Sequence, residues 1–319
     1  DRHEIKRENE ILLKIEACGV CHSQLHGIEG DWLDIGIPPA LPTVPGHEVV
    51  GKIIGIGKDV TKFKVGDRAG ITPLLEACQK CQYCLEGKEY LCESSIITGE
   101  SFKGGYTEYI TVTENFATKV PESMKAEYAA PLFCAGITAY KAVKAAEPKQ
   151  DKKIGIFGIG GVGHMAVQFA KVENCDVIAF SRTQSHLDVA KRLGANDAMK
   201  FTENQDEFLS TLKEKHGTLD AAIVFAPADI VTDTAIKSVK KGGLIVIATV
   251  GENPAFSAFE EKTIRGTLIG STKDMEQVIK ICDEKNIEVI TQTFPLENAN
   301  EVLKKLKDSE IEARGVLIP

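Results

Sequence analysis

The chain has 319 residues, a formal net charge of −8, 43% apolar residues and 26% charged residues. A single hydrophobic core rarely grows beyond ~250–300 residues, so this length favours two domains. The acidic balance argues against a nucleic-acid partner, which would require clustered Lys and Arg. Nowhere does the sequence hold the run of roughly eighteen apolar residues that a membrane span requires. We therefore expect a two-domain globular protein without a nucleic-acid or membrane partner.

The cysteines are the most informative part of the composition. There are nine of them, and four cluster at Cys78, Cys81, Cys84 and Cys92. An odd total with such a cluster fits a disulfide framework poorly, and it is typical of metal binding in a reducing compartment. The first residues also lack the apolar core of a signal peptide. We expect a cytoplasmic location.

The stretch from Cys18 to Glu48 holds the first candidate ligands. A strand predicted over residues 11–15 leads the chain to Cys21, and His47 and Glu48 follow a Gly- and Pro-rich loop over residues 27–45. Thiolate, imidazole and carboxylate are all zinc ligands, and a catalytic zinc keeps one position open for water or substrate. Another stretch of the chain must then supply the remaining ligand.

Residues 49–65 alternate short apolar runs with Gly and Asp, and strand-like sequence returns over residues 106–112. This pattern is typical of short antiparallel strands in a barrel-like domain. Further along, Cys134 precedes a segment with helical spacing. Taken alone, Cys134 has the character of a small buried hydrophobic residue.

The four clustered cysteines have the spacing Cys-x₂-Cys-x₂-Cys-x₇-Cys over residues 78–92. Four thiolates at these spacings can close a tetrahedron around one Zn²⁺ and leave no open position. Such a site is structural and contributes to the free energy of folding. The alternative is a set of free or redox-active cysteines.

From residue 152 the pattern changes to alternating strands and helices. A strand predicted over residues 154–157 is followed by a glycine-rich loop and a helix over residues 164–173, which is the context of a dinucleotide-binding motif. The first glycine of the loop allows a tight turn, the second lets a pyrophosphate approach the backbone, and the last allows close packing of helix and strand. The helix N-terminus favours the phosphates, and a chance match is the alternative. The predicted cofactor residues of the loop are Gly158, Gly160, Gly161, Val162 and Gly163.

The next strand, predicted over residues 176–180, ends at Ser181 and Arg182. An NAD site usually places an acidic residue there to bind the ribose 2′-hydroxyl, whereas a hydroxyl and a guanidinium suit a 2′-phosphate. We therefore predict that NADP(H) is favoured and that NAD(H) is possible. The alternative is that Arg182 is a solvated surface charge.

The rest of the sequence predicts a parallel sheet and, after it, a C-terminal set of two helices and two strands. A doubly wound parallel sheet is predicted for the second half of the chain. Its further strands are expected over residues 198–201, 219–225, 243–249 and 267–269. The chain is then expected to end in a helix over 273–284, a strand over 288–291, a helix over 296–307 and a strand over 315–318.

Three motifs in this order carry a resemblance over the whole chain. They are Gly46-His47-Glu48 with Gly51 and Gly57, the four-cysteine cluster, and the glycine-rich loop. The chain resembles the zinc-containing alcohol dehydrogenases of the medium-chain dehydrogenase/reductase superfamily. The resemblance implies an α/β protein with a GroES-like β-barrel catalytic domain and a doubly wound (Rossmann) cofactor domain. The implied domains are residues 1–135 with 270–319, which include the structural-zinc lobe 78–92, and residues 136–269.

The resemblance also implies a second, catalytic zinc, and thus two zinc ions per chain. Its ligands would be Cys21, His47 and Cys134, with Glu48 close enough to exchange with the water ligand. Cys134 gains this role from the resemblance alone.

Other roles are implied in the same way. Ser23 and His26 match the family's proton relay from the substrate oxygen to solvent. His22 and Arg314 match positions that contact the cofactor pyrophosphate, and Thr138 matches one that contacts the nicotinamide.

The chain departs from the family at Gln24, where members usually carry an Asp that orients the zinc-bound histidine. A Gln can accept a hydrogen bond through its carbonyl, but it cannot raise the basicity of His47 as a carboxylate would. The first strand or two of the family's catalytic domain are also expected to be absent before Ile11.

The implied activity is reversible hydride transfer between a primary or secondary alcohol and a nicotinamide cofactor, with a small alcohol or aldehyde as substrate. A homo-oligomer, tetramer or dimer, is expected by analogy. One alternative is a zinc-free quinone or enoyl reductase of the same superfamily, against which the set Cys21, His47 and Cys134 speaks. The other is a non-catalytic zinc-binding structural relative, in which Ser23 and His26 would have no purpose.

Overall fold

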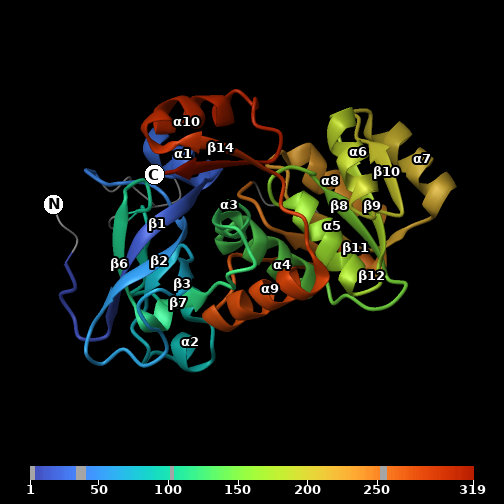
Figure 1. Cartoon of the computed structure of the whole chain (residues 1–319). Coiled ribbons are helices and arrows are strands. Elements are labelled where there is room, and N and C mark those ends of the chain that lie inside the picture. The colour runs from blue at the N-terminus through green and yellow to red at the C-terminus, as the bar shows by residue number, and fades with distance from the viewer. Residues whose placement is uncertain (1–3, 34–40, 101–103, 252–256) are drawn as a thin grey trace. The chain divides into compact units, whose positions relative to one another are not determined.

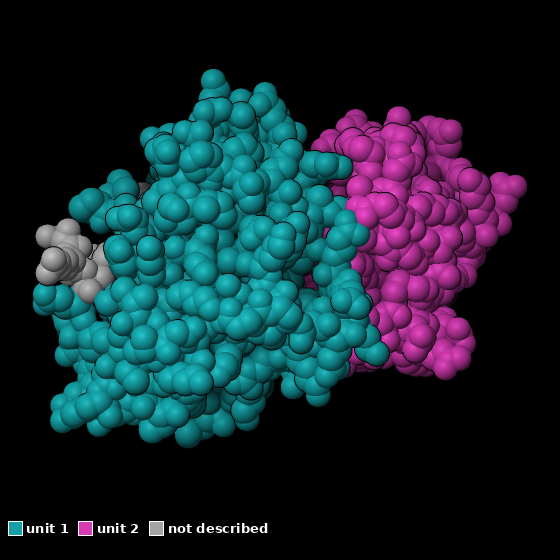
Figure 2. All heavy atoms as spheres, viewed as in Figure 1, with its two compact units in different colours: residues 1–137, 269–319 teal, residues 138–268 magenta. Residues whose placement is uncertain are grey.

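The computed structural model describes residues 4–33, 41–100, 104–251 and 257–319. The chain divides into two compact units, residues 1–137 with 269–319 and residues 138–268, which Figure 2 colours separately. The first boundary falls within helix α4 (Ala135–Ala145). The sequence had placed the two boundaries at residues 135/136 and 269/270.

The first unit is organised around a mainly antiparallel sheet with the strand order β14-β15-β1-β2-β3-β7 (Figure 1). Strand β6 also pairs with β1. Among these pairs, β14 and β15 are parallel and the others are antiparallel. Its strands are β1 (Glu10–Val20), β2 (Glu48–Ile56), β3 (Arg68–Ile71), β6 (Tyr109–Thr113), β7 (Ala117–Lys119), β14 (Thr291–Pro295) and β15 (Arg314–Ile318). Side chains of β1, β2, β3 and β6 form the core, among them Ile11, Leu13, Ile53, Ile71 and Ile110. The predicted barrel-like set of short strands is therefore confirmed, and β1 is longer than expected because it pairs on both sides.

Helices and a small hairpin complete this unit. The hairpin strands are β4 (Leu74–Glu76) and β5 (Ile96–Ile97), and the helices are α1 (His22–Glu29), α2 (Gln82–Leu85), α3 (Ala126–Ala129), α9 (Thr272–Lys285) and α10 (Ala299–Lys307). Short 3₁₀ turns lie at η2 (Glu89–Leu91), η3 (Glu114–Phe116), η4 (Ala130–Phe133) and η6 (Leu296–Asn298). Helix α9 begins with a capping box between Ser271 and Asp274.

The second unit is a six-stranded parallel sheet with the order β10-β9-β8-β11-β12-β13. Its strands are β8 (Lys153–Phe157), β9 (Asp176–Ser181), β10 (Asp197–Lys200), β11 (Leu219–Val224), β12 (Val239–Ile247) and β13 (Thr263–Gly266), and its helices are α5 (Gly163–Val172), α6 (Gln184–Arg192), α7 (Gln205–His216) and α8 (Asp229–Ser238), with the turn η5 at Ala258–Glu260. The central strands are continuous apolar runs because helices cover both faces of a parallel sheet. The strand order reverses between β8 and β11, so the carboxyl end of β8 lies at the topological switch point. The predicted doubly wound sheet is confirmed.

Two predicted strands were misplaced. The strand expected over 267–269 is β13 at Thr263–Gly266, and the one expected over 288–291 is β14 at Thr291–Pro295. Both are edge strands with partly exposed side chains. An edge strand carries only a weak apolar pattern, so its position is set by pairing with its neighbour rather than by its own sequence.

The loop expected over residues 27–45 was also predicted to begin too early. Helix α1 continues to Glu29, and residues 34–40 lie outside the described part of the chain. Within the described residues, no helix combines the length and apolar character that crossing a membrane would take.

Candidate metal and cofactor sites

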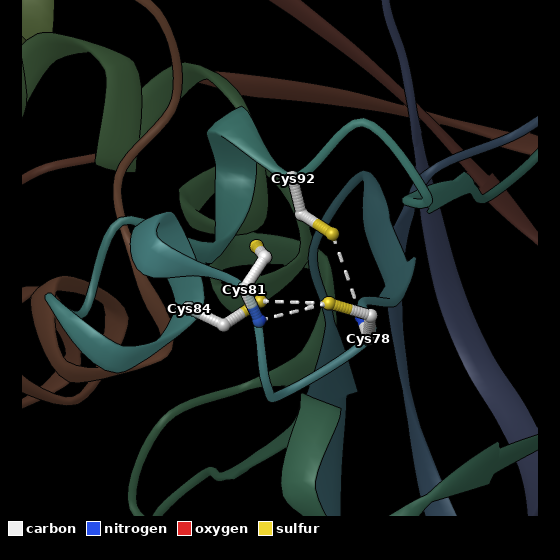
Figure 3. A group of neighbouring side chains, drawn as sticks. All are labelled: Cys78, Cys81, Cys84 and Cys92. Atoms are coloured by element: carbon white, nitrogen blue, oxygen red, sulfur yellow. Dashed lines mark hydrogen bonds between the residues drawn. The ribbon is translucent and has the colours of Figure 1, made fainter.

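The four clustered cysteines form a compact lobe in the first unit (Figure 3). Their sulfur atoms, from Cys78, Cys81, Cys84 and Cys92, all lie within 4.8 Å of one another. The sulfurs of Cys78 and Cys84 are 3.9 Å apart. Tetrahedral zinc with Zn–S bonds of about 2.3 Å requires sulfurs about 3.8 Å apart, so the lobe fits a zinc ion with four thiolate ligands.

Backbone N–H groups prepare these sulfurs for metal. The N–H of Cys81 donates to Cys78 Sγ over 3.3 Å, and the N–H of Cys78 lies 3.5 Å from Cys92 Sγ. Donation from Lys80 and Cys81 lowers the pKa of Cys78 to about 6. Because the thiolate is the form that binds metal, this sulfur is ready as a ligand at neutral pH.

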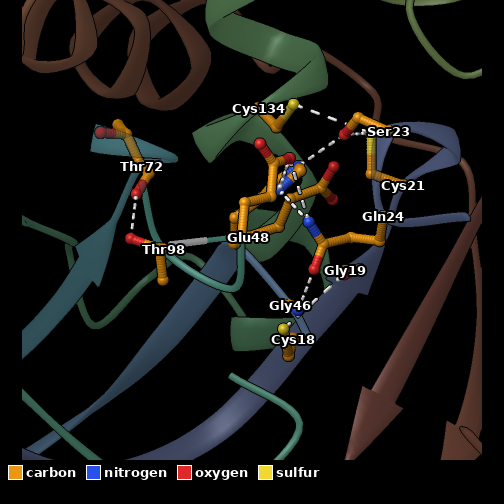
Figure 4. A network of polar contacts seen from close by, with 12 residues as sticks. Cys18, Gly19, Cys21, Ser23, Gln24, Gly46, Glu48, Thr72, Thr98 and Cys134 are labelled. Carbon is orange, nitrogen blue, oxygen red and sulfur yellow. Dashed lines mark hydrogen bonds and ion pairs between the residues drawn. The ribbon is translucent and has the colours of Figure 1, made fainter. Parts of the chain in front are cut away.

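A second cluster brings together three distant stretches of the same unit (Figure 4). Cys21 is the residue before α1, His47 directly precedes β2, Glu48 is the first residue of β2, and Cys134 follows η4. Ligand atoms of all four lie within 4.8 Å of one another, and the sulfurs of Cys21 and Cys134 are 3.9 Å apart. That spacing again suits two thiolates on one zinc ion.

The two thiols of this cluster differ in ionisation. Cys134 donates to Cys21, which lowers the pKa of Cys21 well below its usual value and raises that of Cys134. Ser23 Oγ also donates to Cys21 Sγ over 3.2 Å. The site therefore stabilises an anionic sulfur at Cys21, as a metal ligand requires.

Glu48 forms a buried ion pair at the same place. Arg314 donates from Nη2 of its guanidinium to Glu48 Oε1. Arg314 is 4% exposed and Glu48 is 0% exposed. Burial raises the pKa of Glu48 to about 7, and the charge of Arg314 opposes that rise. The second oxygen, Oε2, is buried and has no hydrogen-bond partner among the described residues. A carboxylate oxygen in that state is available to a cation, so the residues present fit a metal ion.

Close packing between β1 and β2 fixes Glu48. Gly19 pairs with Glu48 across the two strands, and a Cβ at Gly19 would lie 1.8 Å from Glu48 Oε2. Gly19→Ala is therefore expected to displace the carboxylate and to lower the free energy of unfolding by about 1–3 kcal/mol, as overpacking does. Urea unfolding measures this change.

A matched control for this substitution lies in α1. A Cβ at Gly27 would meet no atom within 4 Å. Gly27→Ala is expected to raise stability by up to about 1 kcal/mol, because Ala favours the helix. Equal stabilities of the two variants would contradict the packing argument.

Ser23 and His26 both lie on α1, three positions apart and hence on one face of the helix. Ser23 Oγ is 3.4 Å from His47 Nε2, whereas His26 Nδ1 is 2.7 Å from Asp31 Oδ2. The His26 side chain is 39% exposed, and its ring centroid lies 5.6 Å from that of Trp32. No direct hydrogen bond joins Ser23 to His26 in the part of the chain that is described here.

The glycine-rich loop of the second unit connects β8 to α5. Gly158 has φ 101°, a Cβ at Gly160 would point into open space, and a Cβ at Gly163 would lie 1.9 Å from the carbonyl oxygen of Gly158. Gly161 and Val162 complete the loop, and Val162 is the N-cap of α5. The loop thus leaves backbone open at a helix N-terminus, which fits a pyrophosphate group.

Ser181 and Arg182 lie at the carboxyl end of β9 and just beyond it. Ser181 is 8% exposed and its Oγ accepts from the Thr183 N–H over 3.3 Å, while the Arg182 side chain is exposed. His186 Nδ1 lies 3.4 Å from Ser181 Oγ. A hydroxyl and an imidazole therefore lie together at this strand end, and an exposed arginine follows the hydroxyl in the chain.

The other predicted cofactor residues belong to different units. His22 is the first residue of α1 and Arg314 the first of β15, both in the first unit, whereas Thr138 lies half-buried in α4 at the start of the second. Arg314 was predicted to contact a pyrophosphate, and the partner it has in this structure is Glu48.

Three residues of these sites were not predicted. They are Asp31 beside His26, His186 beside Ser181, and Glu100, whose Oε1 lies 3.8 Å from His47 Nδ1. Asp31 and His186 are each five residues from their partners, and neither pair lies within one helix, so no periodic pattern in the sequence indicated them. Nothing in the local sequence points to Glu100.

Two family models match this chain, one in the first unit and one largely in the second. The family model for the alcohol dehydrogenase GroES-like domain matches residues 7–122, and that for zinc-binding dehydrogenase matches residues 161–284. An alcohol dehydrogenase from Geobacillus stearothermophilus is 39% identical over 97% of this chain and 91% of its own length. These matches cover both the metal clusters and the parallel sheet.

Solved structures agree as well. An alcohol dehydrogenase from the archaeon Aeropyrum pernix has a TM-score of 0.91 and 28% identity, over 100% of this chain and 95% of that one. A cinnamyl alcohol dehydrogenase from Sorghum bicolor has a TM-score of 0.88 and 29% identity, over 100% and 92%. The chain therefore belongs to the zinc-containing alcohol dehydrogenases of the medium-chain dehydrogenase/reductase superfamily, and the protein is an oxidoreductase of that family.

Proposed function

We propose that the protein interconverts small alcohols and aldehydes or ketones at a catalytic zinc held by Cys21, His47 and Cys134, with a nicotinamide cofactor as hydride carrier. The observation that carries this proposal is the cluster of two partly buried thiols, one buried imidazole and one buried carboxylate, whose ligand atoms all lie within 4.8 Å of one another. Zinc bound there would act as a Lewis acid that favours the alkoxide over the alcohol. One oxygen of Glu48 is paired to Arg314, and the other has no partner in the described part of the chain, so Glu48 would exchange with the water ligand.

Ser23 and His26 are proposed to carry the proton away from the substrate oxygen. The Ser23 hydroxyl lies beside Cys21 Sγ and His47 Nε2, at 3.2 and 3.4 Å. His26 is partly exposed and paired with Asp31, so its imidazole can pass a proton between the site and solvent. A bridging hydroxyl or water must connect Ser23 to His26.

The cofactor is proposed to be NADP(H) rather than NAD(H), with its pyrophosphate on the loop that holds Gly158, Gly160 and Gly163. The support is Ser181 and Arg182 at the end of β9, where a ribose 2′-phosphate would find a hydroxyl and a guanidinium. His22 and Arg314 remain proposed contacts of the pyrophosphate, and Thr138 of the nicotinamide.

The lobe of four cysteines is proposed to hold a second, structural zinc, which gives two zinc ions per chain. The nine cysteines are all free thiols in the structure, which favours a reducing, cytoplasmic location. A homo-oligomer, tetramer or dimer, is favoured by apolar side chains near edge strand β13, where Phe259 is 93% and Leu268 58% exposed.

The test follows the absorbance of reduced cofactor during reduction of an aldehyde panel from acetaldehyde to benzaldehyde, with NADPH and NADH side by side. Zinc content is measured on the same preparation. Turnover with two zinc ions per chain is expected. A protein that binds zinc and cofactor yet reduces no aldehyde would contradict the proposed activity.

Arg182→Ala tests the choice of cofactor. A hydrogen bond to a charged group contributes about 1.5–3 kcal/mol, so the KM for NADPH is expected to rise roughly 10–100-fold while that for NADH stays the same. Lys213→Ala, which removes an exposed charge on α7, is the matched control. A wild-type preference for NADH would show that Arg182 is a surface charge, and the alcohol dehydrogenase activity would be unaffected by that result.

A further inference from the structure

His47 is contacted on both of its ring nitrogens. Its Nε2 faces Ser23 Oγ, which in turn donates to Cys21. Its Nδ1 lies 2.8 Å from Gln24 Nε2 and 3.8 Å from Glu100 Oε1. Gln24 Nε2 is also 3.3 Å from Glu100 Oε1, so the amide, the carboxylate and the imidazole meet at Nδ1.

Metal binding through Nε2 imposes a requirement on that meeting point. The imidazole must then carry its proton on Nδ1, and Nδ1–H needs an acceptor. Metal-bound histidines almost always donate this N–H to a carboxylate, a carbonyl or water, which fixes the ring and raises its basicity. The residue nearest to Nδ1 in this chain, Gln24, is an amide.

The orientation of the Gln24 amide is set by Gly46, whose N–H donates to Gln24 Oε1 (Figure 4). Both residues are buried, and Gln24 is 2% exposed. Turning the carbonyl toward His47 would leave the Gly46 N–H unpaired, at a cost of about 1–3 kcal/mol. Gln24 therefore presents its NH2 group to Nδ1, and an NH2 group cannot accept a hydrogen bond.

We propose that Glu100 is a positioning residue for the catalytic zinc: its carboxylate accepts the Nδ1–H of His47 and is itself held by the NH2 group of Gln24. This inference rests on the proposed function, because it requires zinc bound to His47. The Glu100 side chain is only 23% exposed, so water screens the interaction weakly. A shift of about 1 Å brings the carboxylate from its ion-pair distance to hydrogen-bond length. Gln24 thus positions the carboxylate through its NH2 group, and the carboxylate itself belongs to Glu100 in the connection after β5.

The test measures zinc affinity at this site in the full-length holoenzyme, by competition with a chelator, together with the visible spectrum of the cobalt-substituted protein. Glu100→Gln is expected to weaken zinc binding there by about 10–100-fold and to shift the cobalt ligand-field bands. The zinc affinity of the four-cysteine lobe is expected to remain unchanged in this variant. Glu108→Gln, which neutralises an exposed carboxylate of the same connection, is the matched control and should change neither readout.

An exchange variant separates charge from shape. Combining Gln24→Glu with Glu100→Gln keeps both side-chain lengths and places a carboxylate oxygen where Gln24 Nε2 now lies, 2.8 Å from Nδ1. Zinc affinity and the cobalt spectrum are expected to return most of the way to wild type. If the exchange variant loses zinc as readily as Glu100→Gln alone, the carboxylate is not the working group and the inference is overturned.

The remaining outcomes distinguish this inference from the proposed function. A wild-type protein with two zinc ions, whose catalytic-site affinity is unchanged by Glu100→Gln, would overturn the role of Glu100 alone. A wild-type protein that holds zinc only in the lobe would refute the proposed function itself.

Discussion

Cys134→Ser is expected to lower the rate of alcohol oxidation by about 10³-fold or more and to reduce the zinc content from two ions per chain to one. The sulfur of Cys134 lies 3.9 Å from that of Cys21, the separation of two thiolates on one zinc ion. A serine hydroxyl is a poor replacement, because it is not ionised at neutral pH. Losing a Lewis acid removes several kcal/mol of transition-state stabilisation, and each 1.36 kcal/mol corresponds to a factor of ten.

Two measurements check this result. Steady-state rates give the loss of activity, and elemental analysis with titration of released zinc gives the metal count. Cys282→Ser is the control, because that thiol is buried in α9 but belongs to neither metal cluster. Full activity in Cys134→Ser would show that the zinc ligand set has been assigned wrongly.

Cys92→Ser is expected to have the largest effect on stability. The thiol is 4% exposed and packs against the core of the first unit. Zinc bound by four cysteines contributes on the order of 10 kcal/mol to folding in small zinc domains, whereas a whole domain is stable by only about 5–15 kcal/mol. The lobe of residues 78–92 is therefore expected to unfold when one ligand is removed.

The lobe is joined to the C-terminal part of its unit by Glu89. The Glu89 carboxylate accepts hydrogen bonds from the N–H and the hydroxyl of Thr272, at 2.7 and 2.8 Å, and so caps the first turn of α9. Unfolding of the lobe should expose α9 as well. Thermal unfolding and limited proteolysis of Cys92→Ser measure both effects.

A second variant keeps this prediction specific. Glu89→Gln leaves the four thiols intact and weakens only the cap, so zinc content should stay at two ions and stability should fall by about 1–3 kcal/mol. If instead Cys92→Ser melts at the wild-type temperature with the wild-type zinc content, the lobe is not a structural zinc site.

The fold could be predicted from the sequence wherever an element carries its own pattern. The loop that begins at Gly158 follows a buried strand and opens a helix, and the structure places it at the carboxyl end of β8, where the strand order reverses. Strands β13 and β14 were misplaced by a few residues because edge strands are half-solvated and their limits depend on the register with β12 and β15.

The candidate sites divide in a similar way. The spacing of the lobe cysteines is local, so the residues themselves predict a metal site there. Cys134 could be assigned only through the resemblance to a family, because 113 positions separate it from Cys21. The hydrogen bond between Gln24 and Glu100 spans 76 positions, and the Arg314–Glu48 pair spans 266.

Residue types and short spacings were enough to predict the two kinds of domain, the four-thiol lobe, the dinucleotide loop and the first candidate ligands of the second cluster. Each of these features depends on the types of residues that lie close together in the sequence, so it can be recognised without knowing the tertiary contacts. Three contacts became visible only in the folded chain: the Glu100 carboxylate lies near His47 Nδ1, Arg314 pairs with Glu48, and the Gly46 N–H sets the orientation of the Gln24 amide. These contacts depend on how β1, β2 and β15 are arranged in one sheet, and no local pattern specifies that arrangement.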